Sequence, residues 1–238
     1  MGEPRSAGAA GRIVPAATVV PLRDGGGGLE VLLLRRSSRG AFGGMWVFPG
    51  GQVDSGDIDA GTVAAPGGGD AEIRAARRAA VREAKEEADL ELDESSLVTH
   101  SFWLPPAEAP RRFATWFFLA PAGGEIVVDH GEIREHRWLA PSEAMESRDR
   151  GEIDLAPPTF VTLWWLSLRK TVAEALADAG AGEPARFETR VAVDAGGRLA
   201  ATLWDGDAGY ADGDLDKTGP RRRMWMSPEG WRVEINGS

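Results

Sequence analysis

Three glutamates are crowded onto two turns of a predicted helix, in the segment REAKEEADL that runs from Arg82 to Leu90. Glu83, Glu86 and Glu87 are three and four residues apart, and like charges at these spacings repel one another on a helix surface. Either water screens this repulsion, or a positive group lies among the carboxylates. Hard carboxylate oxygens suit Mg²⁺ or Mn²⁺, which often bridge to the phosphate groups of a substrate. The alternative is an ordinary solvated helix face.

The helix that carries these glutamates is predicted over residues 71–88, because AEIRAARRAAVREAKEEA is rich in strong helix formers and Asp70 suits the N-cap. Residues that mark its buried side recur at helical spacing: Ile73, Ala76, Ala80 and Ala84. Glu87 lies at the edge of this stripe, with the other two glutamates beside it. A carboxylate that faces inward is unfavourable unless it is paired or bound to a metal ion.

A glycine pair upstream strengthens the metal-site interpretation. The runs AATVVPL and EVLLLRRS, separated by RDGGGGL, predict two strands joined by a glycine turn, and MWVFPGGQVD follows them. Within it FPGG covers Phe48 to Gly51, and this turn can fold back beside the predicted helix. Glycine lets a backbone approach a phosphate group or a metal ion closely.

The remaining pattern alternates strands with helices and ends in strands alone. LVTHSFWLPP and RRFATWFFLAPA predict antiparallel strands, EHRWLA a shorter strand, and PSEAMESRD a short helix. We expect one longer helix over PPTFVTLWWLSLRKTVAEALADAG, ended by Gly180, and a loop over SGDIDAGTVAAPGGGD. The tail segments RFETRVAVDAGGRLAATLW and RRRMWMSPEGWRVEIN predict two hairpins.

Composition excludes several classes of protein. The 238 residues carry a net charge of −10, which argues against a nucleic-acid partner. We interpret the basic run Arg221 to Met224 as a solvated strand face or turn. No apolar run reaches the roughly 18 residues of a membrane span. The start, MGEPRSAGAAGR, has no apolar core of a secretory signal, so we expect a cytoplasmic protein without a membrane partner.

Zinc and thiol chemistry are not expected. Cysteine is absent, which removes disulfides, thiolate nucleophiles and zinc–thiolate sites. His100, His130 and His136 contain no pair at the i, i+4 spacing of a helical zinc motif. We expect all three histidines in structural or surface positions.

The segments GGQVDSGD and REAKEEADL together resemble the Nudix box, whose pattern is G-x5-E-x7-R-E-x-x-E-E-x-G-x. Its R-E-x-x-E-E core is matched in full, and Gly51 matches the opening glycine. Asp57 stands where the family has its first glutamate, and Asp89 replaces the glycine that ends the helix. Asp tolerates the left-handed conformation of a helix end better than most residues. Residues 58–81 number 24 where the pattern has seven, an insertion of 17.

A wider resemblance concerns the substrate. LLLRRSSRGAFGGMWVFPGGQVD and EHRWLAPSEA, with two further segments, look like a subgroup typified by nudix motif 19 proteins, which is associated with hydrolysis of coenzyme A and acyl-CoA. LLLRRS and GMWVFPGG also resemble the coenzyme-A Nudix motif, with one residue fewer between them. Arg36, Arg39 and Arg112 are candidates to contact phosphates, with exposed surface charge as the alternative for each. Trp46 and Phe48, next to the glycine turn, are candidates to pack on a base or acyl group, although core packing is favoured for Phe48.

The resemblance implies hydrolysis of a diphosphate linked to another moiety, with Mg²⁺ or Mn²⁺ as cofactor. Glu83, Glu86 and Glu87 would hold the metal, together with the carbonyl of Gly50, and Arg82 would orient the glutamates by a salt bridge. Metal-bound water would attack phosphorus. The general base stays open between Glu86, Glu87 and a later loop acid, for which Glu132 and its rival Glu135 are candidates.

We therefore expect an α/β protein with the Nudix fold, an α/β/α sandwich around a mixed β-sheet. The Nudix domain would cover residues 13–180, and residues 185–238 would form a β-rich C-terminal extension. The expected partner is a small-molecule diphosphate: coenzyme A or acyl-CoA, or else ADP-ribose or another nucleoside diphosphate derivative. The alternatives are a non-catalytic Nudix-fold binding module, and an interaction protein or homodimer built on the extension.

Overall fold

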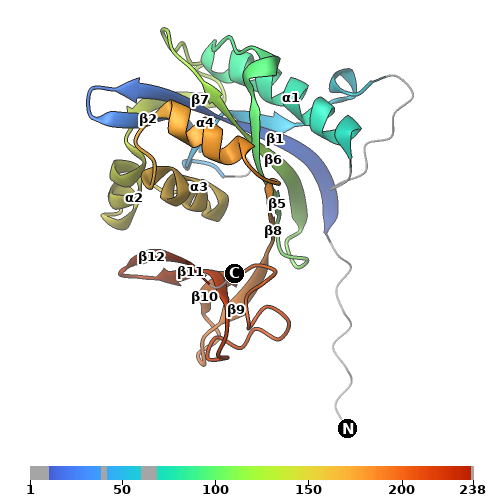
Figure 1. The fold of residues 1–238 in the computed structure, drawn as a ribbon, viewed down its shortest axis with the longest axis vertical. Helices are drawn as coiled ribbons and strands as arrows, with labels where there is room; N and C mark the ends of the chain where they lie inside the picture. Colours follow the sequence, from blue (N-terminus) through green and yellow to red (C-terminus); the bar gives the residue numbers. More distant parts are fainter. Residues whose placement is uncertain (1–10, 39–41, 60–68, 237–238) are drawn as a thin grey trace.

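A mixed β-sheet lies at the centre of the computed structural model, which describes residues 11–38, 42–59 and 69–236 (Figure 1). Its strands run in the order β3-β2-β1-β6-β5-β8, while β4 pairs with β1 and β7 pairs with β2. The pairs β1/β6 and β5/β8 are parallel, and the others are antiparallel. The strands are β1 Arg12–Gly25, β2 Gly28–Arg36, β3 Trp46–Val47, β4 Gly50–Gln52, β5 Val98–Leu104, β6 Arg111–Pro121, β7 Ile133–Leu139 and β8 Ala185–Glu188.

One edge of β1 is shared between two partners. Ala16 to Thr18 pair with β4, whereas Leu22 to Gly25 pair with β2. The strands β4 and β2 therefore occupy different lengths of the same β1 edge. Gly50 lies opposite Thr18, where a Cβ atom would come within 2.4 Å of the Ala17 carbonyl oxygen. Only glycine permits this approach, and the approach holds the predicted FPGG turn against the sheet.

Helix α1, Asp70–Ala88, covers one face of the sheet. The predicted stripe is buried except for Ile73, which is partly buried. The fully buried alanines of α1 are Ala76, Ala79, Ala80, Ala84 and Ala88. The N-cap is Gly69 rather than the predicted Asp70, which is instead the first helical residue. Asp89 ends the helix with φ 52° and ψ 28°, so the expected left-handed conformation is confirmed.

Helices α2 (Pro141–Asp149), α3 (Pro157–Ser167) and α4 (Val172–Gly180) cover the opposite face, as Figure 1 shows. The prediction of one long helix over the last two was wrong. Thr171 caps α4 by accepting a hydrogen bond from the Glu174 N–H at 3.2 Å, and the Val172 N–H donates to Asp24 at 2.9 Å. The first contact caps α4 locally, and the second ties its first residue to β1, so a new helix starts here.

The C-terminal residues form a second, four-stranded antiparallel sheet and contain both predicted hairpins. Its strands are β9 Arg190–Val193, β10 Leu199–Leu203, β11 Arg221–Ser227 and β12 Gly230–Asn236. The first tail strand, β8, joins the large sheet instead, where Phe187 stacks on Trp103 with ring centroids 4.0 Å apart. The division into domains at residues 180 and 185 stays a prediction.

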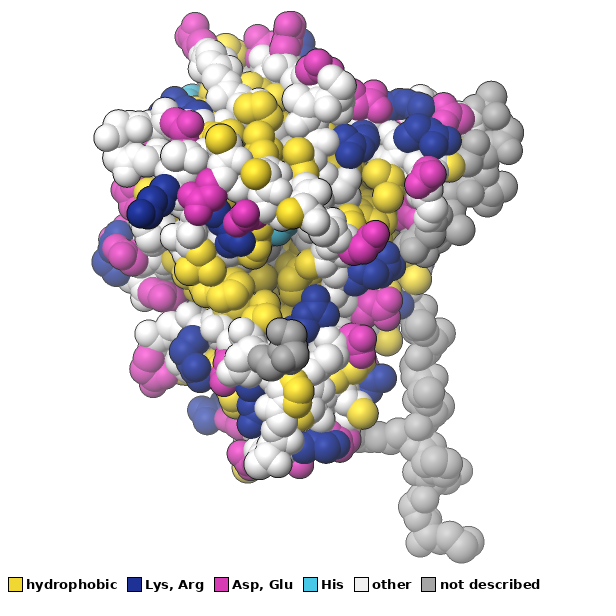
Figure 2. Space-filling view, viewed as in Figure 1, with side chains coloured by type: hydrophobic (Ala, Val, Ile, Leu, Met, Phe, Trp, Pro, Cys, Tyr) yellow, Lys and Arg dark blue, Asp and Glu magenta, His cyan; other side chains and the backbone are white. Residues whose placement is uncertain are grey.

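Hydrophobic side chains gather where α3 faces this second sheet, in the band across the middle of Figure 2. Phe160 of α3 meets Trp231 of β12 edge to face, with ring centroids 5.3 Å apart. Phe160 is buried, whereas the exposed Leu168 lies just beyond the end of α3. In residues 11–38, 42–59 and 69–236, no helix has both the length and the apolar character needed to cross a membrane.

The basic run at residues 221–224 differs from its predicted role as a solvated face. Arg223 is fully buried and donates two hydrogen bonds to Asp207, at 2.7 and 2.5 Å. Burial alone would raise the pKa of Asp207, but the hydrogen bonds from Arg223 and from the Arg222 and Gly209 N–H groups leave it below its usual value. The pair therefore fixes the loop that contains Asp207 under the second sheet.

The histidines lie where the sequence predicts. His100 is buried in β5 and packs on Trp165 with ring centroids 4.5 Å apart. Burial lowers the pKa of His100 to about 4, so this side chain is neutral at pH 7. His130 and His136 are exposed.

Replacing Arg223 with methionine tests the buried pair. Arg223→Met should lower the free energy of unfolding by about 3–5 kcal/mol, because it leaves the Asp207 carboxylate buried without its partner. Arg232→Met is the matched control, since Arg232 is exposed and lies 3.7 Å from Glu234; it should change stability by less than about 1 kcal/mol. Urea denaturation followed by tryptophan fluorescence measures both, and equal effects would contradict the assignment.

Candidate active site

The three glutamates of α1 have different surroundings. Glu87 is only 4% exposed, and its carboxylate accepts a hydrogen bond from the Gly50 N–H at 3.0 Å. Burial raises the pKa of Glu87 to about 7, although the Gly50 N–H and the charge of Arg36 act in the opposite direction. Burial also raises the pKa of Glu83. Glu86 is exposed at the surface of the helix.

Gly51 makes room for Glu83. A Cβ atom on Gly51 would lie 2.3 Å from Glu83 Oε1, so any larger residue would collide with this carboxylate. The two glycines of FPGG thus contact different glutamates. Gly50 donates its N–H to Glu87, and Gly51 leaves space for Glu83.

Arg82 connects the carboxylates to the segment after β4. It donates to Asp57 Oδ2 at 3.0 Å, to Glu83 at 2.8 Å and to Glu86 at 3.2 Å, and to the carbonyl of Gln52 at 3.0 Å. The hydrogen bond to Asp57 is the main cause that raises the pKa of Arg82 above its ordinary value. The resemblance implies that Arg82 orients the glutamates; the structure pairs it with Glu83 and Glu86, and the orienting role stays a prediction.

Asp57 belongs to the Arg82 network but is not among the predicted site residues. It is 5% exposed and binds Arg82 through both carboxylate oxygens, with the longer contact at 3.4 Å. The signal was present, because Asp57 occupies the position of the first glutamate in the box pattern. The inserted segment after it begins at a fixed point, since Arg78 donates to the Asp57 carbonyl at 2.8 Å and to Asp59 at 2.7 Å.

Arg36 and Glu132 form the other side of the site. Arg36, at the end of β2, is ion-paired with Glu132 and lies 3.5 Å from Glu87. The Glu132 N–H donates to Asp129 at 2.8 Å, and its carbonyl accepts from the Ser37 N–H at 2.6 Å, so the loop before β7 is tied to β2.

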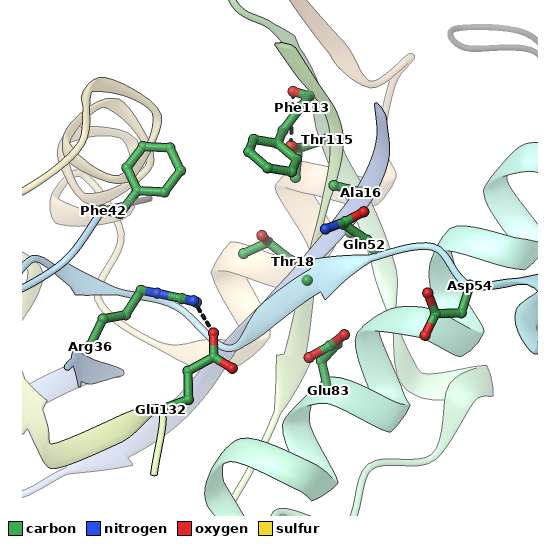
Figure 3. Close-up of a pocket in the computed structure, with 12 residues that line it drawn as sticks. Ala16, Thr18, Arg36, Phe42, Gln52, Asp54, Glu83, Phe113, Thr115 and Glu132 are labelled. Atoms are coloured by element: carbon green, nitrogen blue, oxygen red, sulfur yellow. Dashed lines mark hydrogen bonds and ion pairs between the residues drawn. The ribbon is translucent and has the colours of Figure 1, made fainter. Parts of the chain in front are cut away.

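These groups border a cavity of about 380 Å³ (Figure 3). In Figure 3 Arg36 and Glu132 lie on one side, Glu83 and Asp54 on another, and the rings of Phe42 and Phe113 lie beyond them. The lining residues are Ala16, Ala17, Thr18, Arg36, Phe42, Gly51, Gln52, Asp54, Glu83, Phe113, Thr115 and Glu132. The lining of this cavity thus contains a charged region and, next to it, an aromatic region.

Of the predicted site residues that the structure describes, only Arg36, Glu83 and Glu132 line this cavity, so Arg82, Glu86, Glu87 and Gly50 do not. Four further predicted residues lie elsewhere. Trp46 and Phe48 are each 3% exposed and belong to the core under α2 and α3, where Phe48 meets Phe117 edge to face. Arg112 donates to the Pro105 carbonyl at 3.0 Å and borders a different cavity beside β9. Glu135 of β7 pairs with Arg35 of β2 and with Arg137 of its own strand, and these three side chains lie at the surface.

Two further predictions fall outside the described residues. Arg39 is not described, and neither are residues 60–68 of the inserted loop. Phe42 and Phe113, which do line the cavity, were missed because no local pattern distinguishes a ring that faces a cavity from one that faces the core.

The carboxylates suit a divalent cation. Within the described ranges, no three His, Cys, Asp or Glu side chains already converge as a metal cluster. Nevertheless the charge of Glu83 is among the causes that raise the pKa of Glu87, so the two carboxylates destabilise each other's ionised form. A divalent cation would relieve this repulsion, and the oxygen-only donor set fits Mg²⁺ or Mn²⁺.

The chain matches the family model of the NUDIX domain over residues 12–160, which is more than half of its length. A stretch of 74 residues is 32% identical to putative nudix hydrolase 7 of Caenorhabditis elegans, and it covers 30% of this chain and a quarter of that relative. A crystal structure of a NUDIX hydrolase from Alicyclobacillus acidocaldarius has a TM-score of 0.60 at 21% identity, covering 73% of this chain and 99% of that chain.

A cocrystal structure of the NUDIX domain of Shewanella oneidensis NrtR, complexed with ADP ribose, has a TM-score of 0.47 at 15% identity and covers 64% of this chain and 85% of that chain. At 21% identity, the A. acidocaldarius structure establishes no more than a shared fold. The A. acidocaldarius structure confirms the predicted sandwich around a mixed sheet. Since the domain model covers most of the large sheet and all of α1, the chain belongs to the Nudix hydrolase family.

Proposed function

We propose that this chain is a divalent-metal-dependent diphosphohydrolase that cleaves a diphosphate linked to another moiety. The observation that carries the proposal is the buried carboxylate of Glu87, held by the Gly50 N–H one helical turn from Glu83, which lines a polar cavity. A diphosphate repels an incoming nucleophile, so its hydrolysis requires neutralising cations. The cluster of acids supplies the ligands for such cations.

The metal would be held by Glu83, Glu86 and Glu87, with the carbonyl of Gly50 as a further candidate. When bound, Mg²⁺ or Mn²⁺ neutralises phosphate charge and makes a water molecule more acidic. Arg82 keeps the glutamates in position through its contacts with Glu83 and Glu86 and its anchor at Asp57.

Arg36 is the proposed phosphate-binding residue. Its Nε is buried and makes no hydrogen bond, and its guanidinium borders the cavity. A guanidinium can bind a phosphate group through two parallel hydrogen bonds. Glu132, held against Arg36, is the proposed general base, with Glu86 and Glu87 as the alternatives.

The substrate is proposed from the resemblance of the sequence. Coenzyme A or an acyl-CoA is the leading candidate, and ADP-ribose or another nucleoside diphosphate derivative is the alternative. A binding module without turnover is the rival from another class, and the retention of all three box glutamates argues against it. A cytoplasmic location and a possible homodimer complete the proposal, with no nucleic-acid or membrane partner.

A phosphate-release screen tests the proposed function directly. Purified protein with Mg²⁺ or Mn²⁺ is offered coenzyme A, acetyl-CoA, ADP-ribose, dinucleotides and nucleoside triphosphates, with a phosphatase where the product requires one. Preference for coenzyme A, with 3′,5′-ADP as product, supports the subgroup. Preference for another diphosphate keeps the mechanism and rejects the substrate. Metal binding without any turnover supports the binding module.

Glu86→Gln and Glu87→Gln should each lower kcat by about 100-fold or more, because losing a metal ligand weakens transition-state stabilisation by several kcal/mol. Glu91→Gln is the control, since Glu91 is an exposed acid near the end of the same helix and pairs with Lys85. Steady-state kinetics measure the effect, and thermal melting checks folding. Full activity in both variants would reject the metal site.

Glu132→Gln should lower kcat by about 10²- to 10⁴-fold with little change in Mn²⁺ affinity, as expected for loss of a general base. Glu135→Gln is a matched control, because Glu135 also pairs with arginines but lies away from the cavity. Rate measurements and Mn²⁺ titration separate the two roles. If Glu132→Gln keeps its rate, the base is one of the α1 glutamates.

A further inference from the structure

Strand β9 is an open edge of the second sheet. The sheet runs in the order β12-β11-β10-β9, so within the described residues β9 has a strand partner on one side only. In the same part of the chain, residues 190–193 make no backbone hydrogen bond to any segment other than β10. An edge of this kind presents free N–H and C=O groups, to which a further strand can pair.

An apolar patch borders this edge. Val191 and Val193 are 43% and 55% exposed, and Leu199, which lies opposite Val193 in β10, is 45% exposed. Side chains two residues apart point to the same face of a strand, so the three residues form one patch. Natural edge strands commonly carry charged residues or proline that prevent pairing, whereas the centre of β9 is Val191-Ala192-Val193.

The sequence of β9 is complementary to itself. If two copies pair antiparallel about Ala192, Arg190 lies opposite Asp194 of the second copy, and Val191 lies opposite Val193 of the second copy. Opposite charges stabilise directly opposed positions in a sheet, and β-branched side chains pack well against their neighbours there. Centring the ladder on Val191 or Val193 instead removes the charged pairs. A two-fold axis generates each contact twice, as in most homodimers.

A second cavity, of about 450 Å³, lies beside the same edge. Residues 188–191 border it one after another, and successive side chains point to opposite faces of a strand, so the cavity lies along the edge rather than over one face. In the ladder centred on Ala192, the β9–β10 turn of the second copy, residues 194–198, extends toward this cavity, because it continues from the residue opposite Arg190. The cavity thus has room for side chains of a partner.

The charges of this cavity complement those of the turn. Arg112 and Arg190 border the cavity, and within the described residues both donate to backbone carbonyls rather than to an acid. Asp194 of the second copy supplies an acid for them. The turn also carries Arg198, which pairs with Asp194 of its own chain but keeps 84% of its side chain exposed, and the cavity contains Glu108 as a counterpart. A partner with charges of one sign would leave part of this surface unpaired.

We propose that two copies of this chain associate through their β9 edges, in an antiparallel ladder centred on Ala192 that joins the two small sheets into one. The partner of this surface is thus a second copy. The proposal specifies an interface for the homodimer suggested above, and it is independent of the proposed hydrolysis, because no residue of β9 lines the cavity beside Glu83.

The mass of the full chain in solution tests the association. Gel filtration with light scattering should give twice the 25.4 kDa of one chain. Val191→Lys with Val193→Lys places like charges opposite each other in the ladder, whereas Val191→Lys with Val193→Glu places opposite charges there. The first double variant should therefore weaken dimerisation at least about 10-fold relative to the second. Both positions are exposed, so the folded monomer tolerates either change, and thermal melting verifies folding.

Disulfide crosslinking tests the register in a chain that has no cysteine of its own. The ladder brings position 191 opposite position 193 of the second copy, within disulfide range, and leaves positions of the same number diagonal to each other. A mixture of Val191→Cys and Val193→Cys should therefore form a crosslinked dimer. Either variant alone should crosslink no faster than Ile235→Cys, an exposed control on β12.

The proposal is overturned if the full chain stays at 25.4 kDa, if both double variants dimerise equally, or if the mixture crosslinks no faster than Ile235→Cys. A dimer that both double variants retain equally uses another surface. Failure of the proposed function gives a different result. In that case the substrate screen shows no turnover, while the masses and crosslinks stay as predicted.

Discussion

The bridge from Arg82 to Asp57 is the contact on which the arrangement of the site depends. The two residues are 25 positions apart, yet their charged groups meet at 3.0 Å, and the same guanidinium reaches Glu83. This contact fastens the segment after β4 to the middle of α1. With the Gly50–Glu87 hydrogen bond, it keeps the acids at the point where β4 leaves the sheet edge. Residues inserted between the two anchors can vary in number without moving the acids.

The sequence predicts the features that local chemistry determines. Helix α1 could be predicted because its strong helix formers include alanines at helical spacing. Its left-handed end at Asp89 agrees with the tolerance of Asp for that conformation. Both C-terminal hairpins follow from alternating residues around glycine turns. Of the predicted acids on α1, Glu83 lines the cavity and Glu87 is buried against Gly50, whereas Glu86 is exposed.

Features that depend on distant partners could not be predicted from the same patterns. The helix break before Val172 requires Asp24, and the burial of Arg223 requires Asp207. Phe42 and Phe48 are both aromatic and six residues apart, but one faces the cavity and the other the core. That difference arises from which element covers each ring, and neither local propensity nor spacing contains this information.

Strand β8 has a consequence for how the chain can be shortened. Because β8 pairs with β5, the first strand of the tail belongs to the large sheet, and only the later strands form the second sheet. A chain cut after residue 184 would lose Phe187 from its stack on Trp103 and leave the hydrogen-bonding groups of β5 open along one edge. Such an edge is a template for pairing with other chains. Removing the tail would therefore favour aggregation of the remaining domain rather than give a smaller domain that stays folded and monomeric.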